Sequence, residues 1–358
     1  MLELSTSSIA THGVDRAEDV AAIRRMQASI IAEGERLEAR YPLLAQRDTL
    51  GSAACLGSCA GMVAMGWLYL SGVVPWWATL LVNGFFAGIL NEVEHDLMHY
   101  IYFKRTAWAQ NTLMLLVWAF RGNYMNPWNR RQIHLHHHRT SGSRVDVETR
   151  MTGLGMGFGL LRVLLMLDTL AVLFVSKRLE RESDGAYRRS ETLRNMVPFT
   201  WLFVSLWTSL LAFQAFFLVN RALGLGIELH GGLAAYAHFL EFAWVVYIGP
   251  SVLRTAALHL ISSNTHYSGE NLNLLRQTQS QGAWFFWPLQ PFCFNFGKTH
   301  CIHHLVVHQP FYLRQLVAPV AYRVMRENGI LFDDYGTFRR RNAFPNGVAS
   351  PLSAGRRS

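Results

Sequence analysis

The stretch His134-Leu-His136-His137-His138 stands out because related stretches occur at two other places in the chain. The earlier stretch reads His95-Asp-Leu-Met-His99, and the later one reads His300-Cys-Ile-His303-His304. In each of them imidazoles stand three or four residues apart, so on a helix they share a face and can bind one metal ion. We call these stretches boxes 1, 2 and 3 in chain order. Boxes 2 and 3 have the same spacing, His-x-x-His-His.

The number of histidines indicates a centre with two metal ions. The boxes and His266 hold ten of the fifteen histidines in the chain. Neutral imidazole suits iron, copper and zinc, and so many ligands exceed what one ion takes. The sequence lacks the His-Glu-x-x-His helix of zinc proteases and the two Glu-x-x-His pairs that soluble di-iron bundles use. The isolated histidines, His12, His230 and His238, are interpreted as structural.

Helical spacing selects the candidate ligands within the boxes. In box 1, His95 and His99 follow Asn91 at intervals of four residues on one helix. In box 2 the candidates share a face and His136 is displaced from it; the candidates in boxes 2 and 3 are His134, His137, His138, His300, His303 and His304. Three acids beside box 1 have two open interpretations, either as partners of the second imidazole nitrogens or as a solvated helix end: Glu92, Glu94 and Asp96.

The three boxes resemble those of the membrane fatty acid desaturase and hydroxylase superfamily, over about Asn91 to Tyr312. This resemblance implies two non-haem irons held by eight or more histidines. It also implies an extra ligand after the last membrane span, for which His266 in Ser263-Asn264-Thr265-His266-Tyr267 is preferred over His259. His308 is a candidate outer neighbour of the centre. Cys301, inside box 3, points away from the flanking histidines and is not expected to be a ligand.

The chemistry expected of such a centre is O₂-dependent oxidation of a C–H bond, which acid–base side chains cannot perform. The leading hypothesis is a desaturase of a fatty acyl lipid chain. The alternative is a hydroxylase or ketolase of an alkyl chain, carotenoid or other lipophilic substrate. A membrane metal transporter or sensor is a third hypothesis, but the boxes lie at span ends rather than inside spans. Aromatic residues in 284–287 and 292–296 either line a substrate tunnel or serve packing and membrane anchoring.

The electrons for this reaction must come from outside the chain. The sequence has no Cys-x-x-Cys pair, no nucleotide-binding glycine motif and no His-Pro-Gly-Gly haem signature. We therefore expect a ferredoxin-, rubredoxin- or cytochrome-type carrier with its reductase, docking on a basic face.

Apolar composition predicts an all-α membrane protein. Hydrophobic residues make up 51% of the chain, and four segments approach the ~20 residues that cross a bilayer as helix. They cover residues 51–74, 76–92, 198–220 and 233–259. To form one centre, the boxes must lie on the same side of the membrane. Residues 107–120 are too short to cross. Residues 153–175 carry Arg162 and Asp168, so we expect an amphipathic helix along the interface.

Charge sets the expected orientation. Lysines and arginines crowd residues 100–195, whereas the loop at 75–77 has none. By the positive-inside rule the boxes form a cap facing the cytoplasm, in a multi-pass protein of the bacterial inner membrane. Contact of arginines with anionic lipids accounts for the net charge of +9 without nucleic acid.

Three parts of the chain are expected: a cytoplasmic helical segment at 1–50, the desaturase-like catalytic domain at 51–312, and a cytoplasmic tail at 313–358. A polar amphipathic helix is predicted over Asp15–Arg40, with no cleavable signal peptide before it. The Ser/Gly/Arg-rich end is predicted to be disordered. Four cysteines without a paired pattern fit a reducing compartment.

Overall fold

A computed structural model describes residues 17–122, 125–270 and 272–345. Within those ranges the regular structure is helical, and pairing of extended segments is limited to isolated bridges such as His266–Thr278. The helices are α1 (Ala17–Arg40), α2 (Arg47–Leu70), α3 (Trp76–Met98), α4 (Ala107–Phe120), α5 (Pro127–Thr140), α6 (Val147–Met151), α7 (Leu160–Leu167), α8 (Val172–Glu182), α9 (Arg189–Arg194), α10 (Phe199–Ala222), α11 (Gly231–Ala243), α12 (Gly249–Thr265), α13 (Phe296–Leu305) and α14 (Phe311–Glu327). Shorter turns are η1 (Pro42–Ala45), η2 (Thr169–Ala171), η3 (Trp244–Ile248), η4 (Trp284–Phe286), η5 (Gln290–Cys293) and η6 (Tyr335–Phe338).

Helices α2 and α3 form an antiparallel pair that leads directly to box 1. The turn between them contains Gly72 at a φ of +72°, a conformation that costs glycine little. Pro75 then precedes the first residue of α3, where its missing N–H is no loss. Helix α3 continues without a break from Trp76 to Met98, and His99 caps it. The prediction that the second apolar segment runs straight into box 1 is confirmed.

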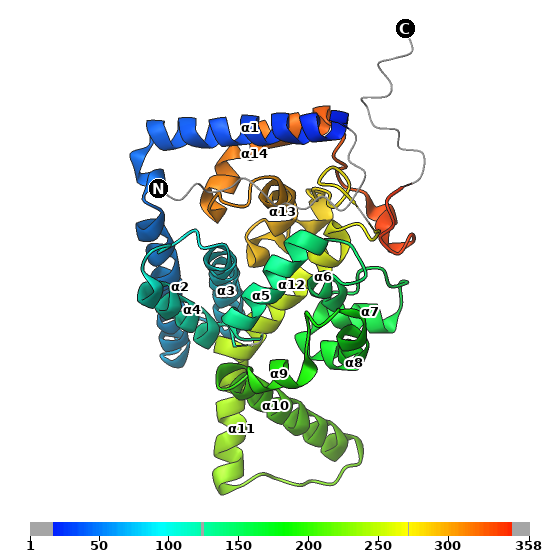
Figure 1. Cartoon of the computed structure of the whole chain (residues 1–358). Coiled ribbons are helices and arrows are strands. Elements are labelled where there is room, and N and C mark those ends of the chain that lie inside the picture. Colours follow the sequence, from blue (N-terminus) through cyan, green and yellow to red (C-terminus); the bar gives the residue numbers. More distant parts are fainter. Residues whose placement is uncertain (1–16, 123–124, 271, 346–358) are drawn as a thin grey trace.

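Among the described residues, three helical segments are long and apolar enough to cross a membrane: Arg47–Leu70, Phe199–Ala222 and Gly231–Thr265. The last combines α11 and α12 through the π-helical turn η3. Helices α10 and α11 extend from the body of the molecule as a pair (Figure 1). Their apolar side chains face outward; Leu218 is 70% exposed and Leu233 60%. Such an exposed apolar surface is typical of helices that face lipid.

Opposite this pair, α1 lies across the molecule with α14 against it (Figure 1). Apolar side chains of both helices form a shared core with α13, including Met26, Ile30, Ile302 and Val317. The amphipathic helix predicted for Asp15–Arg40 is present from Ala17 onward. The predicted boundary at residue 312 falls inside α14. The predicted disorder of the Ser/Gly/Arg-rich end lies largely outside the described residues.

The prediction of one amphipathic helix over 153–175 is wrong. The segment forms α7 and α8, which are separated by the turn η2. Asp168 ends α7, and its carboxylate accepts hydrogen bonds from Leu170 N at 2.9 Å and Trp207 Nε1 at 2.8 Å. Arg162 is fully buried and donates to Ser263 O at 2.8 Å and to Asn342 Oδ1 at 2.7 Å. Both charged side chains therefore have hydrogen-bond partners within the protein.

Candidate metal centre

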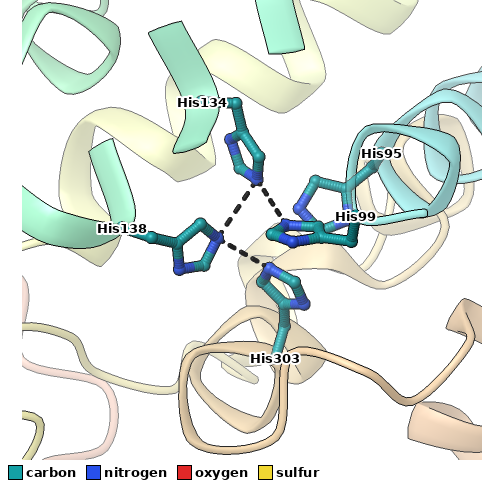
Figure 2. Close-up of side chains that lie close together, drawn as sticks. All are labelled: His95, His99, His134, His138 and His303. Atoms are coloured by element: carbon teal, nitrogen blue, oxygen red, sulfur yellow. Dashed lines mark hydrogen bonds between the residues drawn. The ribbon is translucent and has the colours of Figure 1, made fainter. Parts of the chain in front are cut away.

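The nine candidate histidines converge in two adjacent groups. The first group contains His95, His99, His134, His138 and His303, and the second contains His137, His266, His300 and His304. Within each group the potential ligand atoms lie within 4.8 Å of one another. Figure 2 shows the side chains of the first group pointing towards a common point. The two groups adjoin each other, because the ring centroids of His138 and His304 are 4.6 Å apart.

The spacing of the imidazole nitrogens fits metal binding. In the first group the Nε2–Nε2 distances are 2.9 Å for His99–His134, 3.1 Å for His134–His138 and 3.0 Å for His138–His303. In the second they are 2.8 Å for His266–His300, 3.1 Å for His300–His304 and 3.4 Å for His137–His304. Two ligands at about 2.1 Å from one ion, at tetrahedral or right angles, stand roughly 3.0–3.4 Å apart. The measured distances are close to that range.

Boxes 2 and 3 each contribute to both groups, and their helical spacing explains why. In α5, His134 and His138 are four residues apart and enter the first group, while His137 enters the second. In α13 the assignment is reversed: His300 and His304 enter the second group and His303 the first. Two residues fix the start of helix α5. The Asn126 side chain accepts a hydrogen bond from Asn129 N, and Pro127 occupies the first helical position.

The ninth histidine comes from the end of α12. Helix α12 stops at Thr265, and His266 takes an extended conformation that turns its ring into the second group. Ser141 Oγ lies 3.1 Å from His266 Nδ1. His259, the other candidate, lies outside both groups, with its Nδ1 3.0 Å from Leu165 O. The structure therefore brings His266 to the other candidates and keeps His259 apart.

The remaining sulfur and imidazole candidates also lie outside the two groups. His136 turns away, with its Nε2 3.2 Å from Val145 O. His308 is exposed. Cys301 is buried and accepts a hydrogen bond from Thr278 Oγ1 at 3.1 Å.

Two carboxylates that the sequence analysis did not identify hold the box 2 imidazoles. Asp146 lies 3.0 Å from His137 Nδ1, and Glu148 lies 2.6 Å from His134 Nδ1. Asp146 also caps α6, where it accepts from Thr149 N, and it accepts from Gly142 N at 2.9 Å. A carboxylate on Nδ1 fixes the ring and leaves Nε2 for a metal. The only sequence signal was two acids shortly after box 2.

The three acids beside box 1 are buried and paired with arginines. Glu94 forms ion pairs with Arg121 and Arg130. Arg314 lies 3.0 Å from Glu92 and 3.1 Å from Asp96. The interpretation as a solvated helix end is therefore wrong. Among the described residues these acids make no direct hydrogen bond to an imidazole; the nearest approach is Asp96 Oδ1, 3.9 Å from His95 Nδ1.

Arg314 also links these acids to the first histidine group. Its Nη1 lies 3.0 Å from His303 Nδ1. The residue follows the predicted domain boundary at 312 and so falls in the segment that was predicted to be a cytoplasmic tail.

Electrostatics favour neutral imidazoles. Burial lowers the pKa of His138, His303 and His304 well below the usual value. A neutral ring keeps a lone pair for a metal. His137 differs: burial acts to lower its pKa, but the Asp146 carboxylate outweighs this effect and raises it.

Unpaired buried atoms further support a metal site. Neither ring nitrogen of His95 has a hydrogen-bond partner among the described residues, and His300 Nδ1 also lacks one. Burying such groups without a partner is costly. A metal ion bound to one nitrogen of His95 would remove part of that cost. The residues present therefore fit a metal-binding centre.

A pocket of about 530 Å³ adjoins both groups. It is lined by ligand candidates of both groups and by side chains that include Asn91, Thr149, Thr152 and Phe296. The Phe296 ring stacks on His300 with 4.1 Å between centroids. By contrast, Trp284 and Trp287 are 74% and 60% exposed. The aromatic segment 284–287 therefore offers two indole rings to the surface, while Phe296 lies at the centre.

Fold and site together define a helical membrane protein with a histidine-box metal site. The sequence profile of the family described as fatty acid desaturase matches residues 71–336, most of the chain. The chain belongs to this family, whose members are oxidoreductases that act on lipid chains. A search of the curated proteins found no match.

Proposed function

We propose that this protein is an O₂-dependent non-haem di-iron desaturase that introduces a double bond into a fatty acyl chain. The observation that carries the proposal is the division of nine histidines, eight of them buried and His138 half-buried, into adjacent groups of five and four. Two irons suit imidazole ligands at this spacing. His95, His99, His134, His138 and His303 would hold one iron, and His137, His266, His300 and His304 the other.

The bound irons would supply the oxidising power for removing hydrogen from an unactivated C–H bond. The protein's own residues orient and enclose this centre. Asp146 and Glu148 fix the rings of His137 and His134, and Arg314 contacts His303. We place the reacting carbon in the pocket beside Phe296, because that pocket is lined by candidates from both groups. Overall, the fatty acyl chain loses two hydrogens. These hydrogens, together with two electrons from the carrier and two protons from solvent, reduce one O₂ to two waters.

We further propose four membrane crossings, formed by α2, α3, α10 and the continuous α11–α12 segment. Three of these meet the length and hydropathy expected of a span. The case for α3 is geometric: it returns alongside α2 after a short turn, and its acids lie in its last turns, buried among arginines. The basic residues between 100 and 195 favour a cytoplasmic centre in the bacterial inner membrane.

Product analysis tests the reaction. Membranes expressing the protein with a reducing system should form lipids whose chains have lost two hydrogens, as measured by mass spectrometry under ¹⁸O₂. Gain of one labelled oxygen per chain would instead show the hydroxylase or ketolase reaction. Unchanged lipids in cells whose protein contains iron would contradict a fatty acyl substrate and favour another lipophilic substrate such as a carotenoid.

Reporter fusions test the orientation. Fusions after Val74 and after Asn220 should report the outer side, and fusions within 178–195 and after Ser268 the cytoplasm. A fusion within 178–195 that reports the outer side would contradict the proposed topology, because box 2 would then be separated from box 3 by an odd number of crossings.

A further inference from the structure

A wide groove lies where the chain passes from η1 into α2, beside the loop that joins α3 to α4. It contains about 920 Å³ of space free of protein atoms. Arg47 and Asp48 line one side, and Ile101, Phe103, Lys104 and Arg105 line the other. The mechanism proposed above uses none of these side chains.

The groove carries an excess of positive charge. The acids nearby are engaged: Glu38 pairs with Arg47 at 3.1 Å, and Asp48 accepts a hydrogen bond from Phe103 N at 2.7 Å. Lys104 and Arg105 are exposed and have no ion-pair partner among the described residues. The positive field reaches the side chain of His308, whose pKa is lowered by partial desolvation and by Lys104 and Arg47.

The loop that forms the groove also ends at the metal centre. His99, a member of the first histidine group, stands two residues before Ile101. The Tyr102 hydroxyl donates to Asp96 Oδ2 at 2.6 Å, and Asp96 lies 3.1 Å from Arg314. Arg314 in turn contacts His303 Nδ1. Covalent bonds, hydrogen bonds and the Asp96–Arg314 ion pair thus connect this surface to two ligand candidates of the same group.

An electron donor needs both properties, charge complementarity and a short path to the centre. The four cysteines are all buried and free, and the sequence contains no motif for a redox group of its own. Transient electron-transfer complexes have small interfaces and depend on complementary charge for fast association.

We propose that the groove around Lys104 and Arg105 is the docking site for a small acidic one-electron carrier protein. The proposal rests on the di-iron function proposed above. Each docked carrier is oxidised by one electron, and two such transfers with two protons from solvent complete the reduction of one O₂. The loop from His99 to Phe103 conducts the electron towards the first histidine group.

The experiment compares two charge-reversal variants of the full-length, iron-loaded protein in detergent. The first is Lys104→Glu combined with Arg105→Glu. The control is Arg24→Glu combined with Arg25→Glu, two exposed arginines in the first half of α1. Both change the net charge by the same amount. The groove residues follow the opposite end of α1, and about 15 residues of helix at ~1.5 Å each separate Arg25 from that end at Arg40.

The probe is a plant-type [2Fe–2S] ferredoxin, an acidic protein. We expect the groove variant to slow oxidation of reduced ferredoxin at least ~10-fold at low salt and to flatten its salt dependence. It should also weaken binding of oxidised ferredoxin to the metal-free protein by a similar factor. The control variant should stay within about 2-fold of wild type. Iron reduction by dithionite with methyl viologen should be equal in all three proteins.

The proposal would be overturned if the groove variant bound and oxidised ferredoxin as well as the wild-type protein does at every salt concentration. A defect that appears only with vesicles containing anionic lipid would also overturn it, since the groove would then be a lipid headgroup site. If dithionite no longer reduced the iron of the groove variant, its metal centre would be damaged. The variant Lys104→Gln with Arg105→Gln would then have to show slower ferredoxin oxidation while its iron is still reduced by dithionite. Failure of the di-iron function itself would appear separately, as wild-type protein without iron.

Discussion

The two histidine groups share rings from α5 and α13, yet each is completed by a different part of the chain. The first takes both box 1 histidines and one ring from box 3, and its outer contacts are Glu148 and Arg314. The second takes no box 1 histidine and is completed by His266, with Asp146 and Ser141 as outer contacts. The difference shows that a box does not correspond to a metal site. The His-x-x-His-His spacing instead places some histidines of each helix in one group and the rest in the other.

The largest loss of iron and activity is expected from His137 and His303. Each of them belongs to one histidine group while the other ligand candidates of its box belong to the other group. His137→Ala and His303→Ala should each lower the iron content and abolish activity, because each removes a ligand candidate from one group while leaving its helix in the other. The loss should exceed the ~10–100-fold typical of changes outside the ligand shell. His136→Ala is the matched control on α5 and should keep iron and activity. Equal iron loss in His136→Ala would show that the assignment within box 2 is wrong.

The second group can be tested through its ligand from outside the boxes. His266→Ala should lose iron or nearly all activity, because it takes one of four candidate ligands from that group. His259→Ala should keep its iron and mainly reduce stability, because its ring contacts Leu165 O. Metal analysis and thermal unfolding measure the two effects. The reverse pattern would move the ligand role to His259.

The first group should be sensitive to the arginine that links it to box 1. Arg314→Met leaves Glu92 and Asp96 buried without that cation. Removing one partner of a buried ion pair costs about 3–5 kcal/mol, so the melting temperature of the metal-free protein should fall clearly. Arg323→Met, on the exposed face of the same helix, should change stability by less than about 0.5 kcal/mol. Equal melting temperatures would mean that the acids do not depend on Arg314.

The smallest effect is expected from the carboxylates that orient box 2. Asp146→Asn and Glu148→Gln should each weaken iron binding by about 10–100-fold, because the amide holds Nδ1 less firmly. Asp146→Asn should act mainly on the second group and Glu148→Gln on the first. Competition with a chelator measures both affinities. The exposed-surface control is Glu270→Gln, which should match wild type.

Local patterns allowed much of the site to be predicted. The boxes have helical spacing, and the continuous α3 follows from an apolar run that leads into box 1. Helical periodicity also separated His136 from its neighbours.

The features that could not be predicted from the sequence depend on contacts between residues that are far apart in the chain. Arg314 meets Glu92 across 222 positions, and Arg162 meets Asn342 across 180. No local period encodes such pairs, so Arg162 looked like an interfacial charge and Arg314 like part of a tail. Asp146 and Glu148 lie near box 2, but their role depends on the turn into α6, which short sequence patterns do not specify.

Iron stoichiometry tests the central claim most directly. We predict that protein purified in detergent after expression with sufficient iron contains about two irons per chain, with Mössbauer spectra of two histidine-ligated high-spin sites. His137→Ala and His303→Ala should each fall well below two. One equivalent of zinc with full O₂-independent activity, or unchanged iron in both variants, would contradict the account.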